Sequence, residues 1–480
     1  MSEELGVTHP KSEFPEWYIE VVRKGGFLDQ RTPVRGCDVI MDWGYGIWEQ
    51  IQRIADRLFK EHGVKNYYFP TLIPESFLKK EAKHFSGFVP EVAWVTEAGS
   101  EKLSERLALR PTSETIMYHM FAQWIRSWRD LPLKVNQWCN VFRWETKATR
   151  PFLRSREFLW HEAHTAHATL EDADKQVLDA IEIYKNVIED ACALPVIVLK
   201  RTERDKFAGA LYTVALETFS REAGRIIQVA TVHNLGQNFA RAFDVKFKDK
   251  DQRDKYVWQT SWGFSTRLIG AIIAVHGDDK GAIIPPRVAP IQVVIVPILF
   301  KGKEAPVLQS AQRWKEALRG KGIRVYVDDR DEYTAGWKFN YWELKGVPVR
   351  LEIGPRDVEK GVAVMVPRDT GERREITSPD EVVQELEDVQ RRLFQRAKEQ
   401  LSTSIEDAGN LEEVKKIVNA KKIARAGWCG SEECELKVKD VGAEIRGYMF
   451  LEPEVPEGKT AHCVVCGKDA LRVVYIAKSY

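Results

Sequence analysis

The sequence has no long apolar run. Its longest one, VVIVPILF (Val293 to Phe300), has the size of a buried strand. A helix needs about 20 mostly apolar residues to cross a bilayer, so we expect no membrane span. The first residues, MSEELGVTHPKSEFPEW, carry charges and prolines but no apolar core, so we expect no signal peptide. These absences predict a cytoplasmic protein.

The chain has almost no net charge, because 72 lysines and arginines are balanced by 71 aspartates and glutamates. The overall balance therefore gives no sign of a nucleic-acid partner. There is also no internal repeat and no low-complexity tract, which excludes a repeat architecture. What remains is a globular composition, 44% hydrophobic and 30% charged. With about 150 residues per domain, the length of 480 residues predicts roughly three domains.

Cysteine is scarce, with seven residues in the chain. We expect buried free thiols at the three scattered positions, Cys37, Cys139 and Cys192. The other four form two close pairs near the C-terminal end: Cys429, Cys434, Cys463 and Cys466. Their spacing, Cys-x₄-Cys and Cys-x₂-Cys, can supply four thiolates to a tetrahedral Zn²⁺ ion. Such a closed set leaves no open coordination position, so the zinc would be structural; the alternative is a reduced, metal-free cluster.

Helical and strand patterns divide the chain into units. Apolar residues recur at helical spacing in residues 44–63 and 169–191. Strand patterns adjoin these helices, at residues 131–143, 152–165, 193–200 and 226–232. Because strands follow strands here, the first unit is predicted to be a largely antiparallel sheet with flanking helices.

The pattern becomes regular after the linker GAIIPPRVAP, whose double proline cannot continue a helix. A strand, a helix and three further strands alternate up to residue 366, which predicts a small βαβ domain. A long helix follows, beginning with a capping box formed by Ser378 and Glu381. The predicted domains are 1–285, 286–385 and 386–480, and both cysteine pairs lie in the last.

One short stretch concentrates positive charge: FRWETKATRPFLRSREF (Phe142 to Phe158). It carries five cations and two carboxylates, which suits a receptor for a strong anion such as a triphosphate. On the first strand Arg143 and Glu145 share a face. On the return strand, residues separated by an even number of positions are expected to share one face: Arg154, Phe158, Trp160, Glu162 and His164. Aromatic walls with a few polar groups indicate a pocket; the alternative is a solvated hairpin whose charges face water.

Three motifs in order resemble those of class II aminoacyl-tRNA synthetases: GVKNYYFP, then FRWE with RSREF, then SWGFSTRLIGAII. Further stretches are similar to prolyl-tRNA synthetases of the archaeal and eukaryotic type: RPTSE, FLWHEAHTAH and ATVHNLGQNF. The bacterial type carries a large editing insertion between the second and third motifs. Here the helix and strands predicted above fill the segment from Glu162 to Gly263, so we expect no such insertion.

The resemblance implies an α/β multidomain fold. Its parts would be a class II antiparallel-sheet catalytic core with flanking helices, a βαβ anticodon-binding domain, and a small α+β zinc-binding C-terminal domain. The implied activity is ATP-dependent attachment of L-proline to tRNA(Pro) through an enzyme-bound prolyl-adenylate, with release of pyrophosphate and AMP. The implied cofactors are Mg²⁺ with ATP and structural Zn²⁺, and the implied assembly is a homodimer.

The resemblance also implies the site. The expected catalytic residues are Arg143, bridging the α-phosphate and the amino-acid carboxylate, and Arg267, on the γ-phosphate. The nucleotide would meet Arg143, Glu145, Arg154, Ser155, Phe158, Gln228, Thr231, Ser265 and Arg267. Proline would meet Thr112, Glu114, Arg143, Trp160, Glu162, His164, His233 and Gly263. Tyr480, at the end of the β-rich run VVYIAKSY, would dock near this site; the alternative is a tail that packs on its own domain.

Two other functions fit parts of the pattern. A non-catalytic paralogue would keep the fold for regulation or RNA binding, but it would not need both Arg143 and Arg267. A class II synthetase for another amino acid, such as threonine, would need a catalytic zinc, and no set of cysteines and histidines within residues 60–270 suggests one.

Overall fold

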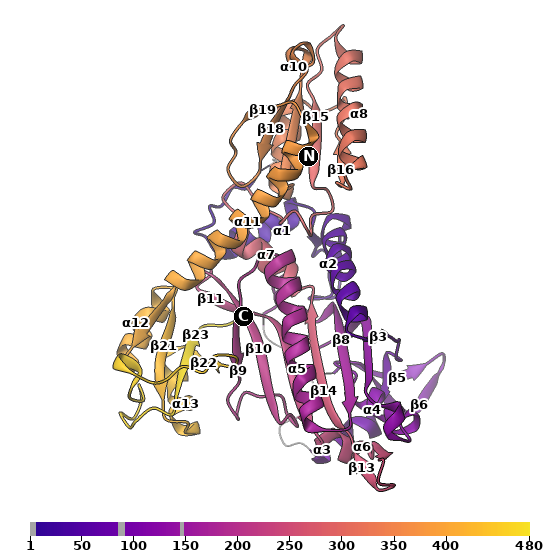
Figure 1. Cartoon of the computed structure of the whole chain (residues 1–480), viewed down its shortest axis with the longest axis vertical. Coiled ribbons are helices and arrows are strands. Elements are labelled where there is room, and N and C mark those ends of the chain that lie inside the picture. The colour runs from indigo at the N-terminus through magenta and orange to yellow at the C-terminus, as the bar shows by residue number, and fades with distance from the viewer. Residues whose placement is uncertain (1–5, 85–91, 145–147) are drawn as a thin grey trace.

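The computed structural model describes residues 6–84, 92–144 and 148–480, and these form an elongated molecule (Figure 1). The broad lower part is built around one 11-stranded sheet, and the narrow upper part around a 5-stranded sheet. A long helix, α11 (Pro379–Thr403), descends from the upper part to the C-terminal unit. Among the described residues, no helix is both long enough and apolar enough to span a membrane.

In the first unit, helices are separated by groups of two or three consecutive strands. Its helices are α1 (Phe14–Lys24), α2 (Asp42–Glu61), α3 (Glu75–His84), α4 (Glu114–Trp124), α5 (Leu170–Lys185), which η2 (Asn186–Ala191) continues as a π-helical turn, α6 (Asn238–Phe243) and α7 (Arg267–His276). Its strands are β1 (Leu28–Asp29), β2 (Val39–Ile40), β3 (Lys65–Asn66), β4 (Leu72–Pro74), β5 (Trp94–Ala98), β6 (Glu101–Leu109), β7 (Leu133–Phe142), β8 (Glu157–His167), β9 (Ile197–Lys200), β10 (Tyr212–Ser220), β11 (Arg225–Gly236), β12 (Lys246–Lys248), β13 (Asp254–Tyr256) and β14 (Trp258–Ser265).

The two helices that the sequence predicts in this unit, at residues 44–63 and 169–191, are present as α2 and as α5 with η2. In α2, Ile47 and Ile51 are fully buried, and the helix ends just before Gly63, whose φ of 76° suits glycine. In α5, the Thr169 side chain caps the first turn by accepting from the Asp172 N–H at 3.2 Å. The predicted antiparallel sheet is confirmed, with β7, β8, β14, β11 and β10 pairing antiparallel in that order.

Alternation along the strands gives the large sheet two different faces. Trp262 and Phe264 of β14 are buried in the core that α2, α5 and α7 complete on one face. Gly263 and Ser265, which alternate with them, point to the opposite face and border an open cavity there. Because successive side chains of a strand point to opposite faces, β14 contributes residues to both the core and the cavity.

The second unit holds the 5-stranded sheet, in the order β16-β15-β17-β18-β19. Its elements are β15 (Val293–Pro297), α8 (Glu304–Gly320), β16 (Val325–Val327), α9 (Ala335–Lys345), β17 (Val349–Ile353), α10 (Pro355–Lys360), β18 (Ala363–Pro367) and β19 (Arg374–Ile376). The pairs β15–β16 and β15–β17 are parallel, as the βαβ pattern predicts, and β18 and β19 add antiparallel pairs. The capping box of Ser378 and Glu381 is confirmed at the start of α11.

The third unit contains β20 (Ile405–Ala408), α12 (Leu411–Asn419), β21 (Ile423–Trp428), α13 (Glu432–Val438), β22 (Glu444–Met449) and β23 (Arg472–Ala477). Its strands do not form a separate sheet. Strand β22 pairs antiparallel with β9, where Tyr448 lies opposite Lys200 and Met449 opposite Leu199. The 11-stranded order is therefore β20-β21-β23-β22-β9-β10-β11-β14-β8-β7-β3, and it runs continuously from the third unit into the first.

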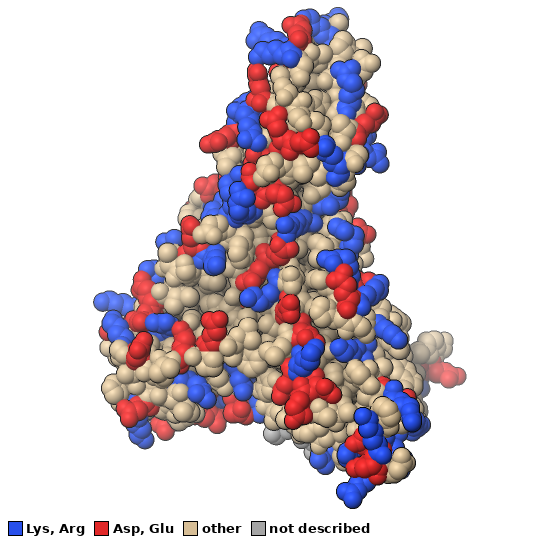
Figure 2. Space-filling model, in the orientation of Figure 1, with Lys and Arg blue, Asp and Glu red and all other residues tan. Residues whose placement is uncertain are grey.

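Charges of both signs are interspersed over the face seen in Figure 2, on all parts of the molecule. This agrees with the net charge of +1. The visible face therefore carries no large field of one sign.

Candidate active site

A cavity of about 770 Å³ opens on the sheet face opposite α2, α5 and α7. It brings together most of the residues that the sequence predicts for the site: Thr112, Glu114, Arg143, Phe158, Trp160, Glu162, His164, Gln228, Thr231, His233, Gly263, Ser265, Arg267 and Tyr480. These residues come from parts of the chain far apart in sequence, which antiparallel pairing of β8, β14 and β11 makes neighbours.

Two predicted residues that the structure describes, Ser155 and Arg154, do not line this cavity. A third, Glu145, lies outside the described residues. Ser155 borders a separate cavity of about 240 Å³, which shares the Phe158 ring with the first. Arg154 forms a tight turn with Arg150, in which each backbone N–H donates to the carbonyl of the other. This turn interrupts the extended strand before β8 begins. The predicted alternation of side chains between the two faces therefore starts only at Phe158.

The floor of the cavity holds the buried carboxylate of Glu162. The Ser113 hydroxyl donates to Oε1, and the Gln137 amide donates to the same oxygen at 2.7 Å. On Oε2, the Ser113 N–H donates at 3.1 Å and His164 Nε2 lies at 3.1 Å. Burial raises the pKa of Glu162, but the hydrogen bond from His164 and the other donors outweigh it and hold this pKa below its ordinary value. Glu162 is thus an ionised carboxylate whose lone pairs are already engaged.

Glu114, at the start of α4, is the second buried carboxylate of the floor. The Thr112 hydroxyl donates to its Oε2 at 2.5 Å. Burial raises the pKa of Glu114, and the nearby negative charge of Glu162 adds to the shift. Compared with Glu162, Glu114 therefore keeps more acceptor capacity free for a cationic ligand.

Two histidines of the cavity are held by hydroxyl groups. Tyr118 Oη lies 2.8 Å from Nδ1 of His164, and Thr213 Oγ1 lies 2.8 Å from Nδ1 of His233. Burial lowers the pKa of His233 to about 3, and the charges of His164 and Arg143 contribute. His233 is therefore a neutral imidazole, which suits a polar wall more than a charged ligand.

Two arginines supply positive charge to the cavity. The guanidinium of Arg143 lies 5.6 Å from the ring centre of Phe158 and 5.2 Å from that of Trp160, and its Nε donates to the Pro111 carbonyl at 3.1 Å. Arg267 is the first residue of α7, where helix N–H groups also favour an anion. Its Nε donates to the Leu153 carbonyl at 3.1 Å. These contacts fix both guanidiniums at the cavity wall.

Gly263 leaves part of the cavity floor without a side chain. A methyl group on Gly263 would lie 2.8 Å from the His161 carbonyl oxygen of β8, which is too close for a real Cβ atom. Gly263 lies directly opposite Glu162 in the β14–β8 pair. The two strands can therefore hold a carboxylate and an open floor side by side.

Several residues that shape the cavity were not predicted from the sequence. Gln137 lies directly opposite Glu162 in the β7–β8 pair, so the register of that hairpin would have indicated it. Arg201 and Arg446 line the cavity too. No local signal points to Arg446, because it comes from β22 of the third unit and reaches the cavity only through the β22–β9 pairing.

A metal site among the floor residues does not fit. Ligand atoms of Glu114, Glu162 and His164 lie within 4.8 Å of one another. However, donors from Ser113 and Gln137 already occupy the oxygens of Glu162 that a cation would need. The floor is therefore arranged for hydrogen bonding to an organic ligand.

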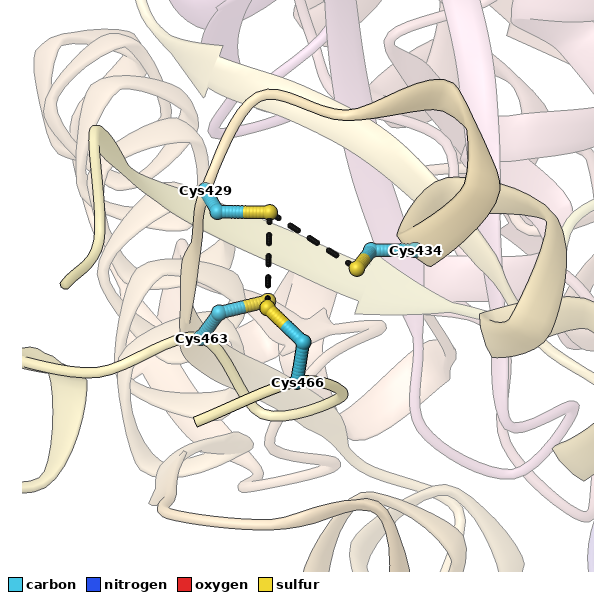
Figure 3. A group of neighbouring side chains, drawn as sticks. All are labelled: Cys429, Cys434, Cys463 and Cys466. Carbon is cyan, nitrogen blue, oxygen red and sulfur yellow. Dashed lines mark hydrogen bonds between the residues drawn. The ribbon is translucent and has the colours of Figure 1, made fainter. Parts of the chain in front are cut away.

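The predicted cysteine group does come together (Figure 3). The four Sγ atoms lie within 4.8 Å of one another, with Cys429 3.6 Å from Cys434 and 3.7 Å from Cys466. Zn–S bonds of about 2.3 Å place tetrahedral sulfurs about 3.8 Å apart. The four cysteines therefore fit a metal ion with tetrahedral coordination and no open position.

Family models match all three units. The model "tRNA synthetase class II core domain (G, H, P, S and T)" matches residues 94–276. The model "Anticodon binding domain" matches residues 292–389, and "Prolyl-tRNA synthetase, C-terminal" matches residues 411–480.

Relatives and a solved structure match over nearly the whole chain. A proline–tRNA ligase from Natranaerobius thermophilus is 48% identical over 482 residues, which cover 99% of this chain and 98% of that protein. One from the archaeon Cenarchaeum symbiosum is 47% identical over 483 residues, covering 99% of this chain and 100% of that protein. The crystal structure of prolyl-tRNA synthetase from Cryptosporidium parvum, complexed with halofuginone and AMPPNP, superposes with a TM-score of 0.94. It is 42% identical and covers 99% of this chain and 100% of its own.

Proposed function

The chain belongs to the class II prolyl-tRNA synthetases of the archaeal and eukaryotic type, and we propose that it attaches L-proline to tRNA(Pro) in two steps. In the first, a carboxylate oxygen of proline attacks the α-phosphorus of ATP and pyrophosphate leaves. In the second, a 3′-terminal ribose hydroxyl of the tRNA attacks the acyl carbon of prolyl-adenylate and AMP leaves. The cavity on the large sheet is the proposed site of both steps.

The observation that supports this proposal most is the position of Arg143 between the aromatic rings and the carboxylate floor of the cavity. Its guanidinium lies over the rings of Phe158 and Trp160, and the cavity that it borders has its carboxylate floor at Glu114 and Glu162. Joining a carboxylate to a triphosphate requires cancelling the repulsion between two anions. A guanidinium at this junction can hold both anions at once, because its planar fork offers several N–H donors.

Proline binds at the carboxylate floor in this proposal. Its secondary ammonium needs an acceptor, and Glu114 has lone pairs free whereas Glu162 already receives several donors. Glu162 then acts by holding Ser113 and His164 in place. The walls around the compact ring are Thr112, Trp160, His164 and His233, and Gly263 is part of the floor.

ATP binds on the Phe158 and Arg267 side of the cavity. Phe158 stacks on adenine, Arg267 holds the γ-phosphate, and Gln228, Thr231 and Ser265 supply polar contacts. Mg²⁺ bound with ATP would neutralise phosphate charge. Gln228, Thr231 and Ser265 would contribute hydroxyl and amide groups near it. Roles for Glu145, Arg154 and Ser155 stay predictions.

The end of the chain contributes to this side as well. The Tyr480 ring lies between two guanidiniums, 5.6 Å from Arg150 and 5.4 Å from Arg225, and its N–H donates to the Ile226 carbonyl at 3.3 Å. We propose that Tyr480 orders this wall. Substitution Tyr480→Ala should slow proline activation several-fold while zinc content and melting temperature hold; unchanged activation would mean that the tail only packs on its own domain.

We propose three domains, 1–285 for catalysis, 286–385 for the anticodon and 386–480 for zinc. Helix α11 crosses the second boundary and would link anticodon recognition to the C-terminal domain. Cys429, Cys434, Cys463 and Cys466 would hold a structural Zn²⁺. Localisation in the cytoplasm also stays a prediction.

We propose a homodimer formed through the first motif. Strand β3 ends the large sheet, and large apolar side chains near it are exposed, among them Tyr68 at 72%, Leu72 at 41% and Trp124 at 39%. Such a patch beside an open strand edge marks an interaction surface. Sedimentation equilibrium should give twice the chain mass; a 55.2 kDa species at micromolar concentration would contradict the dimer.

ATP–pyrophosphate exchange with each of the twenty amino acids tests the function. Proline should support exchange far better than any other amino acid, and charging of tRNA(Pro) should follow. Exchange with a different amino acid would overturn the substrate assignment. Retained tRNA binding without exchange for any amino acid would instead indicate a non-catalytic paralogue.

A further inference from the structure

Three buried charged side chains form a cluster in the cavity wall that the proposed mechanism does not use. Arg201 lies at the end of β9, Glu217 in β10 and Arg446 in β22 of the third unit; their exposed fractions are 5%, 0% and 6%. Arg446 donates to Oε1 of Glu217 through Nη2 at 2.5 Å and through Nε at 3.2 Å. Arg201 Nη2 donates to the same oxygen at 2.5 Å.

The cluster continues to a residue of the nucleotide side. Arg201 Nη2 also donates to Oε1 of Gln228 at 2.5 Å. The Gln228 amide then donates through Nε2 to the Thr231 hydroxyl at 2.5 Å. A chain of hydrogen bonds therefore runs from Arg446 in the C-terminal unit, through Glu217 and Arg201, to two residues that line the cavity.

This chain of hydrogen bonds fixes the orientation of the Gln228 amide and of the Thr231 hydroxyl. The Gln228 carbonyl oxygen accepts from Arg201, so its NH₂ group must face Thr231. The Thr231 oxygen accepts that hydrogen, and its own O–H is left to donate toward the cavity, where a phosphate oxygen would accept it. The backbone carbonyl of Gln228 also accepts from Arg267 Nη1 at 3.2 Å. Gln228 thus contacts two of the groups assigned to ATP, Thr231 through its side chain and Arg267 through its backbone.

We propose that Arg446 and Arg201 are positioning residues for ATP, through which the C-terminal zinc-bearing unit sets the orientation of Gln228 and Thr231 in the active site. The inference rests on the proposed assignment of this cavity side to ATP. It extends the role of the third unit beyond packing, because the nucleotide wall is incomplete without a side chain from β22.

The energetics of the cluster support a fixed arrangement. Burial raises the pKa of Glu217, but the charges of Arg201 and Arg446 outweigh it, and the pKa lies below its ordinary value. An ionised carboxylate with two guanidinium partners holds both in one geometry. Arg201 Nη1 is further fixed by the Arg446 backbone carbonyl at 2.6 Å. Loss of the Arg446 side chain would therefore loosen Arg201 without removing its backbone partner.

The test measures KM for ATP and for proline by pyrophosphate exchange in the full chain carrying Arg446→Gln. KM for ATP should rise about tenfold, a size typical of coupled neighbours, while KM for proline stays within about twofold. The matched control is Arg425→Gln, since Arg425 lies in β21 of the same unit, pairs with Asp407, and is absent from the cavity lining. That control should leave KM for ATP unchanged.

A double-mutant cycle separates relay from direct contact. In a Gln228→Ala background, Arg446→Gln should add no further rise in KM for ATP, because the residue it acts through is gone. Full additivity, or a wild-type KM for ATP in Arg446→Gln, would overturn the inference. Absence of proline-dependent exchange in the wild type would instead overturn the proposed function.

Stability is followed in parallel through melting temperature and zinc content. If Arg446→Gln fails to fold, Arg446→Lys replaces it. Lysine keeps a positive charge beside the Glu217 carboxylate but cannot make both of the hydrogen bonds that the guanidinium makes. The inference then expects a smaller rise in KM for ATP, of about threefold. Equal rises in both KM values in a folded Arg446→Lys protein would mean that the cluster only supports the fold.

Discussion

At the scale of single residues, the two floor carboxylates differ although they are close neighbours. Glu162 receives hydrogen bonds from Ser113 and Gln137 and has a lowered pKa, whereas the pKa of Glu114 is raised by burial and by the charge of Glu162. Two carboxyl groups whose environments push their pKa values apart take different roles. Glu162 organises the floor, and we predict that Glu114 is the carboxyl group whose protonation changes when the ligand binds.

A pH dependence of proline binding follows from Glu114. Its carboxylate form predominates only above its raised pKa, and the proline ammonium needs that form. KM for proline should therefore fall as pH rises through the raised pKa of Glu114, above its ordinary value of 4.5, and binding below that pKa should release a proton. Glu114→Gln should raise KM by about 10²-fold and remove the pH dependence. A pH-independent KM in the wild type would show that Glu114 does not meet the ammonium.

The two cavity arginines should separate kinetically. Arg143→Ala and Arg267→Ala should each slow adenylation about 10²-fold, because each loses a preorganised contact to developing charge. Only Arg143→Ala should also raise KM for proline, since Arg143 is proposed to touch its carboxylate. Arg253→Ala, at an exposed position, is the control. A loss of melting temperature without a loss of rate would make the arginines structural.

At the scale of elements, the join between β22 and β9 decides whether the third unit reaches the site. Gly447 makes the join possible: its φ is 128°, a conformation that side chains rarely adopt, and a methyl group there would overlap the Lys200 carbonyl oxygen. The neighbouring residue, Arg446, projects to the cavity wall. The strand therefore depends on one glycine to pair and to deliver its arginine.

Gly447→Ala should open this join. Backbone strain and overlap should cost about 1–3 kcal/mol, seen as a lower melting temperature, with a higher KM for ATP because Arg446 shifts. Gly409→Ala in the same unit is the control, since its nearest neighbour, the Lys459 carbonyl oxygen, would lie at an ordinary 3.8 Å. Equal effects from both substitutions would argue against a special role of the join.

Local patterns in the sequence predicted much of this arrangement. The alternation of Phe158, Trp160, Glu162 and His164 has a period of two, so it indicated one strand face, and all four line the cavity. The pairing of β22 with β9 could not be predicted, because it depends on residues far apart in the chain. Arg154 was predicted on the same face, but the turn with Arg150 breaks the alternation there. Motif order predicted the family, and tertiary pairing decided which side chains complete the site.

At the scale of the whole molecule, the cysteine cluster and the cavity belong to one continuous structure. Cys434 and Cys463 are part of the apolar core of the third unit, together with Val474 of β23. Strand β23 pairs with β22, which pairs with β9 of the large sheet. A change at the cysteines can therefore be transmitted to the catalytic sheet through neighbouring strands.

Substitution of one of the four clustered cysteines tests this connection. Cys463→Ser should lower zinc content, destabilise the third unit and raise KM for ATP, because a structural ion contributes to folding. Cys37→Ser, which lies outside the group, should change none of these. Elemental analysis, thermal unfolding and pyrophosphate exchange give the three readouts. Unchanged zinc content in Cys463→Ser would contradict the four-thiolate site.

The pairing of β22 with β9 also bears on how the protein is made. A ribosome completes β9 long before β22, and N-terminal parts of a chain fold first during synthesis. Until β22 emerges, β9 presents unpaired backbone groups at an open sheet edge, which is a template for wrong pairing between nascent chains. The partner that closes this edge brings Arg446 to the active site. The same pairing thus closes the edge and brings Arg446 to the cavity, so prematurely terminated chains should be aggregation-prone and should lack this side chain.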